Sequence, residues 1–338
     1  MGYFRFVLSV LVCANHLWVI GGVGRYAVFS FYILSGFLMT TIICERYGTS
    51  LAGVRKYAAN RLLRIYPTYL VVFTFTILAL TIIGSDAARA VDPNLSIPET
   101  VKSWLMNTTL IGLDFSIQDR TIPPSWTLFV ELFFYAVIPL LVRLGAKSII
   151  IWVIMSIAYH AYFMLTATDA GLDWNSRYGD ILAGSLGFAL GCAARFFPYK
   201  VLRFNGAIAI SVLGLTTCYS ITAYFMLIGY NNSDWRYIST FGFYFTMAFS
   251  ILFIVNSINI PQSKFGKFLG DLSYPLYLSH IPIGFVVISA FEMQPRTPLT
   301  FVVCFSFSII GSIALYIFDK RVNKIRDRIR PRSTKSPA

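Results

Sequence analysis

The chain has 338 residues, of which 57% are hydrophobic and only 13% are charged, and its mean hydropathy is +0.67. Soluble globular proteins carry about 25% charged residues, so this composition excludes an ordinary soluble domain and indicates a polytopic membrane protein. The net charge of +13 would suit a nucleic-acid-binding protein, but the distribution of the basic residues follows a membrane topology instead.

Apolar windows along the chain predict about ten membrane-spanning helices, and the fold class is therefore an all-α membrane helix bundle. These windows lie at 3–22, 27–44, 67–84, 125–142, 148–166, 180–194, 205–227, 237–256, 269–290 and 298–318. An even number of spans places the two ends of the chain on the same side. No repeat is detected, and the sequence is interpreted as one membrane domain over residues 1–320 with a basic tail over 321–338.

The basic residues predict which side of the membrane holds the ends of the chain. The side with the basic tail carries 21 of the Arg and Lys residues, and the opposite loops carry 7. Short cytoplasmic loops are enriched in Arg and Lys, so both termini are predicted to be cytoplasmic. The surplus positive charge thus sets topology, and no nucleic-acid partner is expected.

The five cysteines all fall within or at the edges of apolar spans. Their odd number, their scatter and the lack of a CxxC pair argue against disulfides and against a zinc site, so no metal site is predicted. The first apolar stretch has a single positive charge before it and no A-x-A-like cleavage site after it. It is interpreted as a retained helix rather than a signal peptide.

The stretch RFVLSVLVCANH in the first span carries an Arg and a His at its two ends. Arg5 and His16 are about three helical turns apart and so share one face of a helix. With Arg5 at the cytoplasmic surface, a rise of roughly 16 Å places His16 near mid-membrane, where an ionisable residue is a functional candidate. The alternative is that Arg5 is a surface anchor and His16 a buried polar residue bonded to a neighbouring helix.

The cytoplasmic loop 45–66 holds a dense basic cluster and runs into RLLRIYP. Arg61 and Arg64 in this motif are spaced i, i+3, so on a helix their side chains are neighbours. Guanidinium groups bind phosphate bidentately, and the pair is a candidate clamp for one anion. A plain topogenic flank is the alternative interpretation.

The longest loop, 85–124, lies on the predicted external side. Within it SWLMNTTLIGL is apolar but too short to span, and it is expected to be interfacial or re-entrant. Pro123 and Pro124 should end any helix just before the fourth span.

The fourth span, SWTLFVELFFYAVIPLL, contains the acidic residue placed deepest in the predicted membrane, Glu131. It lies roughly 9 Å below the external surface, and His16 lies about 10–13 Å below the same surface on a ~30 Å core. The matching depths predict that the Glu131 carboxylate orients His16 as a general base, with a structural buried pair as the alternative. Tyr135, one turn later, shares the face of Glu131 and is a candidate to satisfy it.

His280 closes the stretch LGDLSYPLYLSH at mid-height of the ninth span. Pro275 is expected to kink that helix and free backbone carbonyls, so His280 is interpreted first as a satisfied polar residue. A part in substrate binding is the second interpretation.

Together these stretches resemble the acyltransferase 3 family of integral membrane acyltransferases. RFVLSVLVCANH resembles the family's opening Arg/Lys-x10-His, and RLLRIYP resembles its RxxR-x-x-P. FSFYILSGFLM, SWTLFVELFFY and LGDLSYPLYLSHIP resemble three further family motifs in the family's order. Five motifs in order over a ten-helix pattern make the resemblance specific.

The resemblance implies transfer of an acyl group, usually acetyl, from acyl-CoA to a hydroxyl of a cell-surface carbohydrate. An exopolysaccharide, an O-antigen or a lipid-linked precursor is the acceptor expected, and the bacterial inner membrane is the location expected. Acetyl-CoA enters as donor substrate, and no permanently bound cofactor is implied. The oligomeric state is not predicted.

The resemblance also suggests roles for individual residues. His16 is then the general base with Glu131 as its carboxylate, while Arg61 and Arg64 bind the phosphates of coenzyme A. Arg5 is expected to hold a further phosphate or to guide the pantetheine arm.

The same motifs suggest two minor roles. Trp126 and Tyr135 are candidates for substrate binding. Ser35 and Gly36, as small residues, are expected to let the first and second helices approach closely.

A transporter or flippase for a lipid-linked sugar is the alternative function, using the intramembrane charges as a proton relay. Transporters often contain paired half-repeats, and no such duplication is detected in this sequence. A non-catalytic assembly factor is a third possibility, and it would not require a His and a Glu at matching depth.

Overall fold

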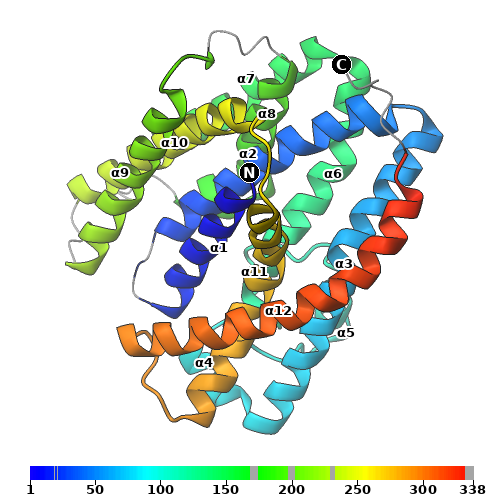
Figure 1. Cartoon of the computed structure of the whole chain (residues 1–338). Coiled ribbons are helices and arrows are strands. Elements are labelled where there is room, and N and C mark those ends of the chain that lie inside the picture. The colour runs from blue at the N-terminus through cyan, green and yellow to red at the C-terminus, as the bar shows by residue number, and fades with distance from the viewer. Residues whose placement is uncertain (19, 21, 168–173, 197–201, 229–232, 332–338) are drawn as a thin grey trace.

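The computed structural model describes residues 1–18, 20, 22–167, 174–196, 202–228 and 233–331. It is 83% helix, and the part of the chain that it describes contains no strand. The ten helices that correspond to the ten predicted spans are α1 (Gly2–Leu17), α2 (Val23–Ile42), α3 (Leu51–Ile83), α6 (Trp126–Leu144), α7 (Ala146–Thr166), α8 (Ile181–Phe196), α9 (Ala207–Leu227), α10 (Ser233–Ser257), α11 (Lys264–Ala290) and α12 (Pro298–Ile329). Within the described ranges, eight of them are long and apolar enough to cross a membrane, and α1 and α8 are shorter. The predicted polytopic helical fold is confirmed (Figure 1).

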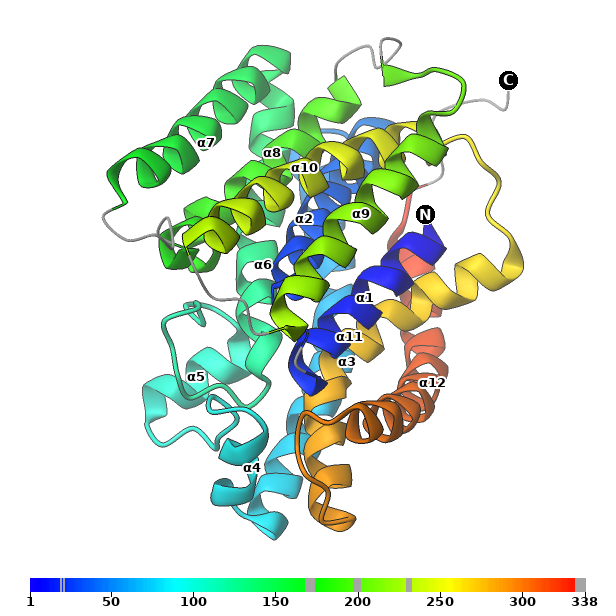
Figure 2. The ribbon, with the colours of Figure 1, turned by 90° about the vertical axis from the view of Figure 1, so that its left-hand side faces the viewer.

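Helices α2 and α11 form the centre of the bundle. The apolar window of α11 is 78% buried inside the protein and that of α2 is 67% buried, against 17% for α7, α9 and α12. Figure 2 shows α7 at the margin of the bundle and α2 inside it. The peripheral helices therefore keep most of their apolar surface for lipid, while α2 and α11 are enclosed by protein.

Two helix pairs approach so closely that only glycine fits between them. A Cβ on Gly2 of α1 would lie 1.8 Å from the carbonyl oxygen of Gly266 in α11. In the second pair, a Cβ on Gly36 of α2 would lie 2.3 Å from the carbonyl oxygen of Phe188, and one on Gly191 of α8 would lie 2.1 Å from that of Ile33. Small residues at membrane helix interfaces permit this close packing of backbones.

The structure corrects the predicted partner of the small residues in the second helix. Gly36 faces α8, not the first helix, and the Ser35 hydroxyl donates a hydrogen bond to Glu131 in α6. Gly36 is small because the α8 backbone packs against it, and Ser35 is polar because its hydroxyl binds Glu131.

The third helix is longer than the predicted span 67–84. After a short π-helical turn, η1 (Ile43–Tyr47), α3 starts at Leu51, where the Ser50 hydroxyl accepts a hydrogen bond from the Gly53 N–H at 3.2 Å. The predicted cytoplasmic loop 45–66 is therefore mostly helix. Hydropathy missed these turns because their basic residues interrupt the apolar window, although Arg and Lys are good helix formers.

The first helix is shorter than the predicted span 3–22, because it ends at Leu17. At the other end of the chain, α12 continues past the expected domain boundary at residue 320 to Ile329. The predicted basic tail thus begins as helix, and residues 332–338 lie outside the described residues.

The loop 85–124 folds back against the end of the bundle. It contains α4 (Ser85–Val91), α5 (Val101–Thr109) and a 3-10 turn, η2 (Pro123–Ser125), so the stretch expected to be interfacial or re-entrant is largely the short helix α5. The buried Asn107 side chain joins two parts of the loop, donating to the Asp119 carbonyl at 2.8 Å and accepting from the Thr121 N–H at 3.0 Å. Val91 and Leu95 share an apolar cluster with Leu17, Ile281 and Phe285, and this cluster fixes the loop against α1 and α11.

We expect Gly36→Ala to destabilise the folded protein. The added methyl group meets the backbone of α8, which cannot rotate away, and overpacking of this kind costs about 1–3 kcal/mol or more. Thermal melting of the detergent-purified variant, followed by size-exclusion chromatography, should show a lower melting temperature.

Gly311→Ala in α12 is the matched control. Its added methyl group meets the terminal methyl of the flexible Ile283 side chain, which can move aside. Equal melting temperatures for the two variants would contradict the close packing of α2 on α8.

Candidate active site

A cavity of about 150 Å³ lies among α1, α2, α3, α6 and α11. We call it the arginine cavity because Arg5, Arg61 and Arg64 all line it. Its wall also contains Glu131, several hydroxyl groups and apolar side chains. The complete lining is Arg5, Val28, Phe31, Tyr32, Leu34, Ser35, Leu38, Met39, Arg61, Arg64, Ile65, Thr127, Leu128, Glu131, Tyr135, Ser273, Tyr274 and Tyr277.

The three arginines reach this cavity from two helices. Arg5 is on α1, whose Ser9 hydroxyl donates to the Ser273 carbonyl of α11 at 3.0 Å and holds the two helices in register. Arg61 and Arg64 are on adjacent turns of α3, as their i, i+3 spacing predicts. The structure thus brings together three residues that lie up to 59 positions apart in the sequence.

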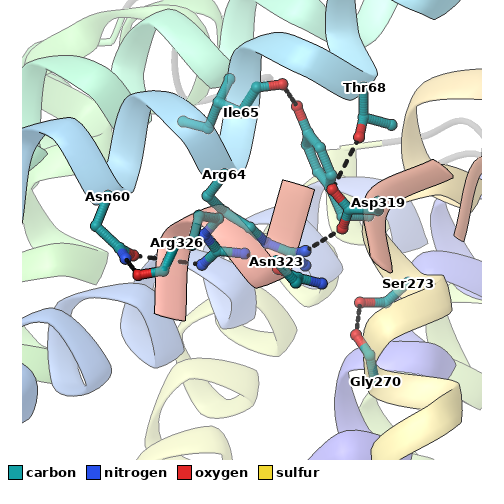
Figure 3. Close-up of polar contacts among 10 residues, drawn as sticks. Asn60, Arg64, Ile65, Thr68, Gly270, Ser273, Asp319, Asn323 and Arg326 are labelled. Carbon is teal, nitrogen blue, oxygen red and sulfur yellow. Dashed lines mark hydrogen bonds and ion pairs between the residues drawn. The ribbon is translucent and has the colours of Figure 1, made fainter. Parts of the chain in front are cut away.

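A buried carboxylate on α12 holds Arg64 in place. The Nη1 atom of Arg64 lies 2.8 Å from Oδ2 of Asp319, and the Thr68 hydroxyl donates to Oδ1 of Asp319 at 3.2 Å (Figure 3). The Arg64 guanidinium also lies over the Tyr274 ring, 5.3 Å from its centroid. Asp319 is only 1% exposed, and sequence reasoning missed it because it follows the last predicted span.

Glu131 lies in the wall of the arginine cavity and is satisfied by hydroxyl groups. Its Oε1 atom accepts a hydrogen bond from Ser35 at 2.8 Å and a second one from Tyr135. Tyr135 contacts Glu131 from one turn away, as their spacing on one helix face predicts.

Trp126, at the start of α6, is buried outside the arginine cavity. Its ring packs edge-on against Phe115, with ring centroids 5.0 Å apart, and against Tyr178 at 5.2 Å. These contacts place Trp126 in an aromatic cluster, and the cavity lining begins at the next residue, Thr127.

His16 lies in the last turn of α1, beside the loop 85–124. Its Nδ1 atom is 3.6 Å from Oδ2 of Asp92, and its ring centroid is 5.4 Å from that of His280. The His16 side chain is 29% exposed and that of Asp92 is 13% exposed. The imidazole therefore faces a carboxylate and can still be reached from outside.

The predicted pairing of His16 with Glu131 is wrong: the carboxylate beside His16 belongs to Asp92. Equal depth in the membrane does not fix the position of a helix around the bundle axis, so the depth argument could not distinguish neighbours from distant residues. The early end of α1 also brings His16 next to a loop that sequence reasoning treated as a connection. Asp92 sits in an Asp-Pro-Asn turn, which carries no periodic signal.

The surroundings of Asp92 favour its ionised form. The largest influence, burial, raises its pKa, but contacts with His16 and with the backbone N–H and side chain of Asn94 outweigh burial and hold the pKa of Asp92 below its ordinary value. The Asn94 N–H donates to Oδ1 at 2.9 Å, which leaves Oδ2 for His16. Because an anionic carboxylate favours a proton on Nδ1, the Nε2 atom of His16 is left as the basic nitrogen.

His280 is fully buried and its Nδ1 atom lies 3.2 Å from the Leu276 carbonyl oxygen. A carbonyl can only accept, so Nδ1 carries the proton and Nε2 is an acceptor. This Nε2 has no hydrogen-bond partner among the described residues. The prediction of a satisfied polar residue therefore holds for one ring nitrogen and not for the other.

Tyr277 lies between the two groups of polar residues. It lines the arginine cavity, and its hydroxyl contacts Thr127 Oγ1 at 2.6 Å, while its ring centroid is 6.4 Å from that of His280. The arginine cavity thus lies towards the Arg5 end of α1, and His16 lies at the opposite end of this helix. Tyr277 lies between them.

The sequence profile of the acyltransferase domain family, acyltransferase 3, matches residues 1–317. The chain belongs to this family. O-acetyltransferase OatA of Staphylococcus aureus is 24% identical over 323 residues in strain NCTC 8325 / PS 47 and equally in strain COL, with 88% of this chain and 51% of each relative covered. A putative O-acetyltransferase of strain MSSA476 is 22% identical over 333 residues, covering 92% of this chain and 52% of that protein.

The chain spans about half the length of the curated relatives that it matches. No solved structure matches it. Family membership and the apolar helices together identify a multi-pass membrane protein of the acyltransferase 3 family.

We expect Asp319→Ala to destabilise this acyltransferase-family chain by about 3 kcal/mol, the lower end for breaking a buried ion pair, because Arg64 keeps some contact with solvent. The substitution leaves the Arg64 guanidinium without its carboxylate. Thermal or denaturant unfolding of the purified protein measures the change.

Asp327→Ala is the matched control, because Asp327 is exposed on the same helix. Its stability should stay close to that of the unsubstituted chain. A loss of the same size in both variants would show that the Arg64–Asp319 pair does not stabilise the fold.

Proposed function

We propose that this chain transfers an acetyl group from acetyl-CoA to a hydroxyl of a cell-surface carbohydrate, with His16 as the general base and Asp92 as the carboxylate that orients it. Family membership supports acyl transfer, and the names of the relatives support oxygen as the acceptor atom and acetyl as the group. The observation that carries the proposal is the His16–Asp92 pair, which stands beyond Tyr277 from the arginine cavity.

The arginine cavity suits an anionic donor with a long arm. Guanidinium groups bind phosphate bidentately, and Arg61 and Arg64 present two of them at one end of the cavity. Arg5 lines the same cavity and adds a third positive charge. Coenzyme A has phosphates at one end and a thioester at the other, so its phosphates would lie at the arginines and its pantetheine arm would run towards Tyr277.

The reaction needs a base for the acceptor hydroxyl. In the proposed step the hydroxyl proton passes to Nε2 of His16 while the hydroxyl oxygen forms a bond to the thioester carbonyl carbon. The carbon–sulfur bond then breaks, and the imidazolium returns its proton to the sulfur of the leaving coenzyme A. Asp92 stabilises the imidazolium between the two steps, as a carboxylate on Nδ1 does in other catalytic His pairs.

Two neighbours of His16 complete the proposed arrangement. The unpartnered Nε2 of His280 can accept a hydrogen bond from a second hydroxyl of the sugar and so orient it. Tyr277 lines the arginine cavity, and its ring lies next to His280. In the proposed reaction this ring moves aside for the acetyl group. The exposed side of His16 leads to the loop 85–124, and the acceptor would enter from there.

The proposed acceptor class is the one that the family resemblance implies. An exopolysaccharide, an O-antigen or a lipid-linked precursor would be modified in the bacterial inner membrane. With cytoplasmic termini, as the basic residues predict, the arginines face the cytoplasm, where acyl-CoA is found, and His16 lies nearer the external side.

Transfer of labelled acetyl from acetyl-CoA to carbohydrate by the purified chain tests this function, and two variants test the pair. We expect His16→Ala and Asp92→Asn each to lower kcat by about 10²–10⁴-fold, the usual contribution of a general base, with little change in KM for the donor. Removal of either member takes away the base or its orientation without touching the arginine cavity.

Asp86→Asn is the matched control, because Asp86 is exposed in the same loop region. It should leave kcat unchanged. If Glu131→Gln loses as much kcat as Asp92→Asn, Glu131 rather than Asp92 would be the residue that orients His16. Full activity of His16→Ala would overturn the proposed mechanism.

We expect Arg61→Gln to raise KM for acetyl-CoA by about ten- to a hundredfold with a smaller effect on kcat, because one charge-assisted phosphate contact is lost. Arg55→Gln is the control, since Arg55 is exposed on the same helix. Steady-state kinetics with varied donor measure both. An unchanged KM in Arg61→Gln would exclude Arg61 from donor binding.

A further inference from the structure

Positive charge exceeds negative charge where the last turns of α12 cross α3. Arg61 and Arg64 of α3 and Arg326 of α12 gather there. Figure 3 shows Arg64 and Arg326 beside the α12 carboxylate, Asp319. Asp319 pairs with Arg64. Within the described ranges neither Arg61 nor Arg326 forms an ion pair with a carboxylate, and each is repelled by the other arginines.

Asn60 joins the two unpaired arginines. Its Oδ1 atom accepts from Nη2 of Arg61 at 2.8 Å and from Nη2 of Arg326 at 3.4 Å. Its Nδ2 atom donates to the Arg326 carbonyl at 3.2 Å, and Asn323 accepts a hydrogen bond from Nη1 of Arg326. Two guanidinium groups that share one oxygen lie close enough for neighbouring phosphates of one ligand to contact both.

Both arginines keep unused donors. The Nε atoms of Arg61 and Arg326 are buried and have no hydrogen-bond partner among the described residues. The Nη1 atom of Arg61 donates to the sulfur of Met39 at 3.5 Å, and a thioether sulfur is only a weak acceptor. An anion between α3 and α12 would satisfy these donors and offset the repulsion.

Arg326 differs from Arg61 and Arg64 in two ways. It does not line the arginine cavity, so it lies further from Tyr277 along the path that the donor would follow. It also lies outside residues 1–317, the segment that the family profile matches, so the family motifs assign it no role.

We propose that Arg326 binds the 3′-phosphate of coenzyme A and makes the end of α12 part of the donor site. This inference rests on the proposed use of acyl-CoA. In coenzyme A the pyrophosphate adjoins the pantetheine arm and the 3′-phosphate lies beyond it on the ribose. The order of the phosphates thus matches the order of the arginines outward from the cavity, with Arg61 and Arg64 at the pyrophosphate and Arg326 at the 3′-phosphate. Arg326 acts here as a specificity residue that distinguishes coenzyme A from donors without the 3′-phosphate.

The experiment measures equilibrium binding of coenzyme A and of 3′-dephospho-coenzyme A to the full purified chain in phosphatidylcholine nanodiscs. The unsubstituted chain should bind coenzyme A about ten- to a hundredfold more tightly, the value of a hydrogen-bonded charge pair. Arg326→Gln should lose that preference and bind both ligands with the affinity that the unsubstituted chain shows for 3′-dephospho-coenzyme A. Arg328→Gln, which removes an exposed arginine two residues away, should keep the preference.

The outcomes separate this inference from the proposed function. If the unsubstituted chain binds neither ligand, the proposal that acyl-CoA is the donor is wrong, and so is the proposed role of Arg326. If it binds both ligands equally, or if Arg326→Gln keeps the preference for coenzyme A, the donor stands and only the role of Arg326 is overturned. If Arg326→Gln keeps the preference for coenzyme A but binds less anionic lipid than the unsubstituted chain, Arg326 contacts a lipid headgroup phosphate instead, and its proposed role is overturned.

Discussion

The close contact between α1 and α11 fixes the position of the first helix and of the site residues that it carries. Gly2 lies against the backbone of Gly266, and Ser9 is bonded to the Ser273 carbonyl, so the first helix cannot slide or rotate along its neighbour. A helix of sixteen residues fixed in this way carries Arg5 near its start and His16 in its last turn. The distance between Arg5 and the His16 imidazole is therefore set by the length of a single helix.

The polar groups in the interior form two sets with different chemical character. The arginine cavity combines guanidinium groups with the hydroxyl-bonded Glu131, an environment that suits an anion. The His16 end has an imidazole, an ionised carboxylate and a second imidazole with a vacant acceptor nitrogen. Buried charges without partners are costly in an apolar interior. Asp92 partners His16 and Asp319 partners Arg64, whereas Arg61 has no carboxylate partner among the described residues. Tyr277 contacts both sets, because it lines the arginine cavity and its ring centroid lies 6.4 Å from that of His280.

The buried Asp319 shows how a residue near the end of the chain shapes the α3 arginines. Its carboxylate fixes one guanidinium, Arg64, and leaves Arg61 and Arg326 to share the amide of Asn60. The consequence is a region where donors outnumber acceptors, which is the electrostatic condition for binding a phosphate ligand.

The class of fold and the ionisable residues of the site could be predicted from the amino-acid sequence alone. Hydropathy located ten helices, because apolar length is a local property, and the motif residues Arg5, His16, Arg61 and Arg64 stand out where ionisable groups enter apolar helices. Which of these residues contact one another depends on how the helices and loops pack. The carboxylate beside His16 comes from Asp92 in a loop, and the carboxylate beside Arg64 comes from Asp319, 255 residues away. Spacing along a helix fixes the depth and the face of a residue, whereas its partner on another element depends on how separate helices are arranged around one another.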